Sequence, residues 1–165
     1  METLWSPWRQ AYVSGAANDP SKSVCVFCEI AAHPADDETN FVLFRGKHNF
    51  IVLNAYPYIS GHLMVAPYAH LAELDALALE ASNEMMDLIK RSQTALRDAY
   101  NPQGFNLGMN LGRAAGAGIA DHLHMHVLPR WTGDTNFMLT VGHTRVIPED
   151  LAATYARLRQ RFLLP

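Results

Sequence analysis

Cysteine and long apolar runs are scarce in this sequence of 165 residues, which holds two Cys. Two cysteines are too few for a disulfide scaffold, so a reducing cytoplasm is the expected location. No stretch approaches the roughly 18 apolar residues that cross a bilayer, and the first residues lack the basic-then-apolar order of a signal peptide. We therefore expect a cytoplasmic protein without membrane contact.

An excess of positive charge is also lacking. Thirteen Lys and Arg against sixteen Asp and Glu give a formal net charge of −3. This balance offers no basic surface for binding nucleic acid. A small phosphorylated ligand is still compatible with it, because backbone N–H groups and a few imidazoles hold phosphate without changing the global charge.

Length and apolar content favour one domain over residues 1–165, with hydrophobic residues making up 49% of the chain. The elements expected after an irregular arm at 1–24 are strands at 41–45, 49–54 and 61–67, a main helix at 80–100, alternating strands at 105–111 and 121–128, and a last helix at 148–162. The two alternating strands should lie side by side, joined by a glycine-rich link at 112–118.

Three of the eight histidines alternate within five residues, at His122, His124 and His126. On a strand this spacing places all three imidazoles on one face, with the middle ring between the others. Three interpretations are open. The rings are buried polar groups bonded to backbone, or His-x-His ligands of a catalytic zinc completed by Asp121 or another histidine, or His124 is a nucleophile that attacks phosphorus. An imidazole pKa of about 6.5 leaves enough neutral ring near neutral pH for the last of these.

The histidine run, followed by Pro129-Arg130, resembles the motif of the histidine triad superfamily of nucleotide hydrolases and transferases. The resemblance extends to four further stretches: Leu4–Arg9, Cys25–Ile30, Gly61–Pro67 and Trp131–Met138. It looks closest to the bacterial branch of diadenosine tetraphosphate phosphorylases, also described as ATP adenylyltransferases. It implies an α+β fold with an antiparallel sheet of about five strands, one main helix and a C-terminal helix, the helices lying on one side.

The resemblance also implies a chemistry, nucleotidyl transfer through His124. In that chemistry His126 would hydrogen-bond phosphate oxygens and assist the leaving group. The family's substrate-binding positions fall on Val26, Phe27, Ile30 and Val52 for the base, Asn54 for ribose hydroxyls and Asn110 for phosphate. Gly116 and Gly118 belong to the glycine-rich link, where backbone can approach phosphate closely. No organic cofactor is expected.

One departure from the family pattern leaves the acceptor open. Many members carry Gln four residues before the first triad histidine, where this chain has Gly118. The expected reaction is the cleavage of a dinucleoside polyphosphate such as diadenosine tetraphosphate, with inorganic phosphate as acceptor. The alternatives are hydrolysis of such compounds or of nucleoside phosphoramidates, and a non-catalytic nucleotide-binding module.

Cys25 and Cys28, taken alone, suit a zinc site, a redox pair or two small buried residues. In zinc-bearing members of the family the other two ligands occupy positions that His70 and His122 match. Two Cys and two His make a closed tetrahedral set, which implies structural zinc. The resemblance further implies a homodimer formed through the main helix and the strand before the triad, whereas His62 is expected only to cap or pack.

Overall fold

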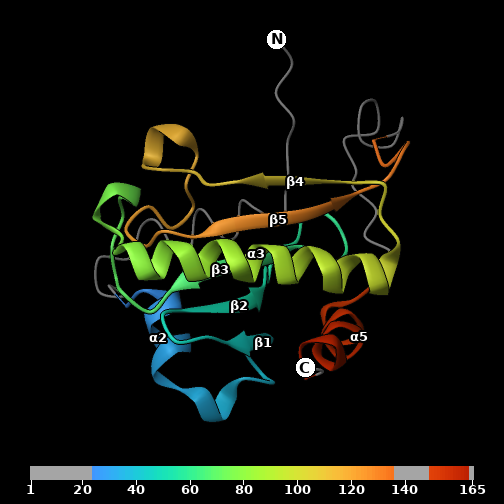
Figure 1. Cartoon of the computed structure of the whole chain (residues 1–165), viewed down its shortest axis with the longest axis horizontal. Coiled ribbons are helices and arrows are strands. Elements are labelled where there is room, and N and C mark those ends of the chain that lie inside the picture. Colours follow the sequence, from blue (N-terminus) through green and yellow to red (C-terminus); the bar gives the residue numbers. More distant parts are fainter. Residues whose placement is uncertain (1–23, 136–148, 164–165) are drawn as a thin grey trace.

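A computed structural model describes residues 24–135 and 149–163. It has an α+β arrangement, in which α3 runs across a five-stranded antiparallel sheet (Figure 1). The helices are α2 (Val26–Ala32), α3 (Leu79–Tyr100) and α5 (Leu151–Leu163), and the strands are β1 (Val42–Arg45), β2 (Asn49–Leu53), β3 (Leu63–Pro67), β4 (Gly104–Gly108) and β5 (Met125–Arg130). The expected arm at 1–24 falls almost wholly outside the described residues. None of the helices in the described ranges is long and apolar enough to span a membrane.

The strand order, β1-β2-β3-β5-β4, places the first meander beside the strand that follows the glycine-rich link. β3 pairs with β5 so that Met64 lies opposite His126 and Leu63 opposite Val127. β4 pairs with β5 on the other side, from Gly104 opposite Arg130 to Gly108 opposite His126. The sheet therefore brings the connector after β2 and the connector after β4 to the region around the triad.

One face of the sheet carries the main core, covered by α3 and α5. Alternate strand residues such as Ile51, Leu53 and Val65 pack there against Met85, Leu88, Ile89 and Leu96 of α3 and Leu158 of α5. The apolar positions of α3 recur at the helical period, which explains why they form one buried stripe. The helix ends at Tyr100 and is capped by Asn101, whose φ of 46° is left-handed, just before Pro102.

The opposite face holds a smaller core beneath α2, with Phe27 and Ile30 packed on Phe50, Val52 and Ala66. The two predicted helices, α3 and α5, lie on one side as expected, whereas α2 was not predicted and covers the other face. This helix has only seven residues, too few for its periodicity to stand out in the sequence. Arg45 holds its carboxyl end, because the guanidinium donates to the carbonyl of Ile30 at 2.6 Å and pairs with Asp37.

The meander strands and the main helix agree with the predicted ranges, but the last two strands differ. β5 starts at Met125 rather than 121, so His122 and His124 precede it, and it continues through Pro129 to Arg130. Proline is tolerated because β3 no longer lies beside β5 at that position, leaving β4 as the neighbour. β4 ends at Gly108 rather than 111; it is the end strand in the described sheet, and its Leu107 is 47% exposed.

Candidate active site and metal centre

A pocket opens over the triad between two connectors. Its lining residues come from the β2–β3 connector, the β4–β5 connector and the sheet itself: Asn54, Tyr56, Tyr58, Met64, Asn110, Gly116, Gly118, Ile119, His124 and His126. Six of the predicted site residues are thus brought together from segments far apart in sequence. Gly116 has a φ of +86°, a conformation that glycine adopts without strain, so the link can turn tightly at the pocket.

His124 is held in one orientation by the chain itself. Its Nδ1 lies 2.9 Å from the carbonyl oxygen of His122, and a carbonyl only accepts, so Nδ1 carries the hydrogen. The lone pair of the neutral ring is therefore on Nε2. The side chain is buried, with its ring centroid 4.9 Å from that of Phe27. Burial lowers the pKa of His124, and the hydrogen bond to His122 only partly opposes this, so the neutral form is favoured.

His126 receives its orientation through His62. The backbone N–H of Tyr58 lies 3.2 Å from Nδ1 of His62, so that nitrogen accepts and the hydrogen of a neutral His62 is on Nε2. His62 Nε2 in turn lies 2.9 Å from Nδ1 of His126 and donates to it. A neutral His126 consequently carries its hydrogen on Nε2. His62, expected only to cap or pack, also fixes the tautomer of a triad member.

Only the Gly-His pair at the start of the stretch 61–67 could have drawn attention to His62 from the sequence. A buried histidine after a glycine is common enough as a packing residue, so nothing in the spacing links it to His126. The link is made by the pairing of β3 with β5, which sets His62 and His126 side by side with ring centroids 5.0 Å apart.

Asn54 directly follows β2 and lines the pocket wall. Its Oδ1 accepts the backbone N–H of Tyr56 at 2.9 Å, an Asx turn, while Nδ2 lies 3.3 Å from Nδ1 of His62. The residue both turns the chain and lines the pocket. The turn alone would explain an asparagine here, so ribose binding stays a prediction.

The four residues predicted to bind the base lie outside the pocket over the triad. Phe27, Ile30 and Val52 belong to the core under α2, Phe27 with no exposed surface, and Val26 is 47% exposed on the same helix. None of the four lines the pocket over the triad. Phe27 instead packs beneath the rings of His122 and His124. Their role in base binding stays a prediction.

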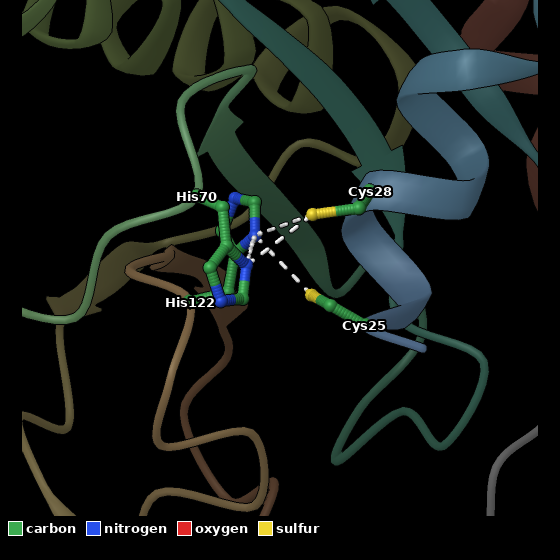
Figure 2. A group of neighbouring side chains, drawn as sticks. All are labelled: Cys25, Cys28, His70 and His122. Atoms are coloured by element: carbon green, nitrogen blue, oxygen red, sulfur yellow. Dashed lines mark hydrogen bonds between the residues drawn. The ribbon is translucent and has the colours of Figure 1, made fainter. Parts of the chain in front are cut away.

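Cys25, Cys28, His70 and His122 form a second cluster, in which one ligand atom from each lies within 4.8 Å of the others (Figure 2). The cysteines come from the start of α2, His70 from the loop after β3, and His122 from the segment before β5. Nε2 of His122 donates to the carbonyl of Pro67 at 2.9 Å, which leaves Nδ1 as the nitrogen that faces the cluster.

The distances within the cluster fit a tetrahedral metal. Zinc with Zn–S bonds of about 2.3 Å and Zn–N bonds of about 2.0 Å sets its N–N pairs about 3.3 Å and its S–N pairs about 3.5 Å apart. The two Nδ1 atoms are 3.3 Å apart, and three of the four sulfur to nitrogen distances are 3.2 Å for Cys25–His122, 3.3 Å for Cys28–His70 and 3.6 Å for Cys28–His122. Burial and the adjacent Cys25 raise the pKa of the Cys28 thiol, and a bound cation would lower this pKa again by stabilising the thiolate.

Comparison with known proteins agrees with this geometry. The model of the HIT domain family matches residues 36–133 of this chain. The chain is 41% identical over 157 residues to a Mycobacterium tuberculosis protein named AP-4-A phosphorylase, covering 93% of this chain and 80% of that protein. It is 28% identical over 131 residues to an adenosine 5'-monophosphoramidase of Schizosaccharomyces pombe, covering 78% of this chain and 91% of the relative.

Solved structures show the same fold. A zinc-bound histidine triad family protein from Mycobacterium smegmatis superimposes with a TM-score of 0.68 at 26% identity, covering 84% of this chain and 93% of that one. A histidine triad nucleotide-binding protein from Sulfolobus tokodaii gives a TM-score of 0.67 at 24% identity, with 84% and 92% covered. With the triad, its pocket and the matched region in agreement, the chain belongs to the HIT domain family.

Proposed function

We propose that this protein transfers a nucleotidyl group by way of His124. The observation that carries the proposal is the direction of two hydrogen bonds to triad rings that line the pocket. His124 donates from Nδ1 to a backbone carbonyl and so keeps its lone pair on Nε2. His126 accepts at Nδ1 from His62 and so presents a hydrogen on Nε2. A nucleophile and a hydrogen-bond donor are thus adjacent, with ring centroids 4.9 Å apart.

The proposed reaction takes diadenosine tetraphosphate in two displacements. Nε2 of His124 attacks the α-phosphorus, a P–N bond forms, and the P–O bond to ATP breaks with its electron pair leaving on oxygen. His126 donates a hydrogen bond from Nε2 to that oxygen. An oxygen of inorganic phosphate then attacks the adenylylated ring, the P–N bond breaks, and ADP leaves with His124 restored.

Phosphate is the proposed acceptor because of two observations. The 41% identical mycobacterial relative is named AP-4-A phosphorylase, and Gly118 of the pocket lacks the side-chain amide of many family members, which makes the hydrolase-like members poorer guides. Water as acceptor is the second candidate, favoured by the relative named a monophosphoramidase. A binding module without turnover is the third.

Product analysis separates these candidates. The full-length protein is incubated with diadenosine tetraphosphate, with and without inorganic phosphate, and the nucleotides are identified. ATP and ADP that appear only with phosphate support phosphorolysis, whereas ATP and AMP in its absence would identify a hydrolase. Intact substrate together with an unmodified His124 in the mass spectrum would leave nucleotide binding as the function.

Zinc held by Cys25, Cys28, His70 and His122 is the second part of the proposal, and its role is structural. The metal-compatible cluster in the described ranges includes His122 but neither His124 nor His126. The group would cross-link α2 to the segment that presents the triad. Two thiolate ligands need a reducing compartment, so we place the protein in the cytoplasm. Chelation is expected to lower the thermal midpoint by several degrees, and activity lost with the fold intact would instead indicate a catalytic metal.

A homodimer formed through the main helix α3 and the strand β4 is the third part. β4 is the end strand of the described sheet, and an edge with an exposed apolar side chain, Leu107, is a template for pairing with a second copy. We expect sedimentation to give a dimer, and Leu107→Lys to shift it toward the monomer. Leu74, 44% exposed but on a separate 3-10 turn, provides the control: Leu74→Lys should leave the dimer unchanged. A wild-type monomer would contradict this part.

A further inference from the structure

The chain has only two thiols in its 165 residues, and both lie in the metal cluster. Cys25 and Cys28 are half-buried rather than enclosed, and His70 beside them is exposed. Figure 2 shows the two sulfurs directed from the start of α2 toward the same point as the two imidazoles. A small oxidant therefore reaches the sulfurs from solvent, and whatever happens to one sulfur happens next to the other.

We propose that Cys25 and Cys28 are an oxidation site, at which a peroxide joins the two sulfurs in a disulfide and expels the metal. This inference rests on the proposed zinc site. The sulfurs lie within 4.8 Å of each other, so a short approach of the two side chains brings them to the S–S bonding distance of about 2.05 Å. An accessible cysteine with a second cysteine poised to resolve it is the arrangement that oxidises reversibly.

The step balances with hydrogen peroxide as oxidant. One thiolate sulfur attacks an oxygen of the peroxide, the O–O bond breaks, and a sulfenic acid forms with release of water. The second sulfur attacks the sulfenic sulfur, the S–S bond forms, and the hydroxide that leaves takes up a proton as water. The two sulfurs together lose two electrons, two Zn–S bonds are lost, and the net change consumes two protons.

The consequence reaches the nucleophile through His122. Nδ1 of His122 faces both sulfurs, and its carbonyl oxygen is the acceptor that fixes the tautomer of His124. With the metal gone, the four proposed metal–ligand bonds that join α2 to the triad segment are lost. The rate of nucleotidyl transfer is then expected to fall about tenfold, which is the size of effect usually seen when a residue that orients a metal ligand is lost.

The test uses full-length protein whose zinc content is measured first. Peroxide is added in steps while zinc release is followed with a chromophoric chelator and the intact mass is recorded. We expect one zinc released per chain and a loss of about 2 Da, both reversed by dithiothreitol and zinc. His124→Ala should give the same release and mass change, because the oxidation does not use the nucleophile. Cys28→Ser keeps one thiol and should show no such mass loss.

Several results would overturn the inference. Zinc that stays bound while methionines are already oxidised would do so, and so would release accompanied by oxygen gain on the sulfurs instead of a disulfide. Disulfide-linked dimers in place of the internal bond would also contradict it. Protein that binds no zinc at the outset would refute the metal site itself. Protein that binds zinc normally but does not release it when peroxide is added would refute only this inference and would leave the proposed function intact.

Discussion

The two faces of the sheet come from the same strands but serve different ends. In β2, Ile51 and Leu53 enter the core under α3, while Phe50 and Val52 enter the core under α2. Among the described residues, the first core has sixteen buried members and the second has seven. The apolar burial that stabilises the fold is therefore concentrated on the α3 face.

The α2 face, which has the smaller core, also holds the buried imidazoles. His62, His122, His124 and His126 are all buried, and each has a hydrogen-bonding partner from backbone or another ring. Burying a polar ring costs free energy unless its hydrogen bonds are replaced, and here the replacements also decide which nitrogen carries the hydrogen. The comparison teaches that one face supplies stability and the other uses part of it to orient reactive groups.

The largest expected effect lies on the α2 face, in His124→Ala. Removing the nucleophile should lower kcat for diadenosine tetraphosphate by at least about a thousandfold, because the proposed covalent intermediate forms on His124. Nucleotide binding and the thermal midpoint should change little. Steady-state kinetics and calorimetry measure both. His33→Ala, which removes an exposed histidine, serves as the control. A His124→Ala rate near that of the wild type would defeat the assignment.

The converse change lies on the α3 face, in Leu96→Ala. Leu96 has no exposed surface and belongs to the main core, so its truncation should cost about 3 kcal/mol in the free energy of unfolding. Urea denaturation measures the loss, and kcat at a temperature where the variant is folded should stay close to the wild-type value. Leu79→Ala, at a position 70% exposed on the same helix, should cost less than about 0.5 kcal/mol. Equal costs would deny that the α3 face carries the stability.

A smaller effect is expected where α3 grips the turn between β1 and β2. The carboxylate of Glu84 accepts the backbone N–H groups of Lys47, His48 and Asn49 at 2.6, 2.7 and 2.8 Å. Burial alone would raise the pKa of Glu84, but these bonds and one from the Asn49 side chain outweigh it and lower the pKa. Glu84→Gln should therefore cost about 1–2 kcal/mol in urea unfolding. The control Glu80→Gln, at an exposed position of the same helix, should cost less than about 1 kcal/mol. A loss as large as that of Glu84→Gln would refute the role of the Glu84 hydrogen bonds.

The sequence predicted the α3 face better than the α2 face, for a physical reason. The stripe of α3 and the alternation of β2 and β3 repeat over many residues, so periodicity predicts them. α2 is a single short helix, and the start of β5 depends on where β3 offers a partner. The triad stood out by its alternation and the two cysteines by their spacing, while the family resemblance supplied the triad roles and the ligands His70 and His122, and the structure brings the four cluster residues together. The role of His62 was missed because it depends on the pairing of β3 with β5.

The smallest effect concerns pH and tests whether burying the imidazoles lowers the free energy of unfolding that the α3 face provides. Burial lowers the pKa of His124, and also of His122, below the value in the unfolded chain. As pH falls below about 6.5, the unfolded chain binds protons that the folded chain refuses, so the free energy of unfolding should fall until the lowered pKa values are passed. Urea denaturation of chelator-treated protein at several pH values measures the slope. His124→Asn, which cannot titrate there, should give a shallower slope, and an unchanged slope would mean that His124 is not buried at this cost.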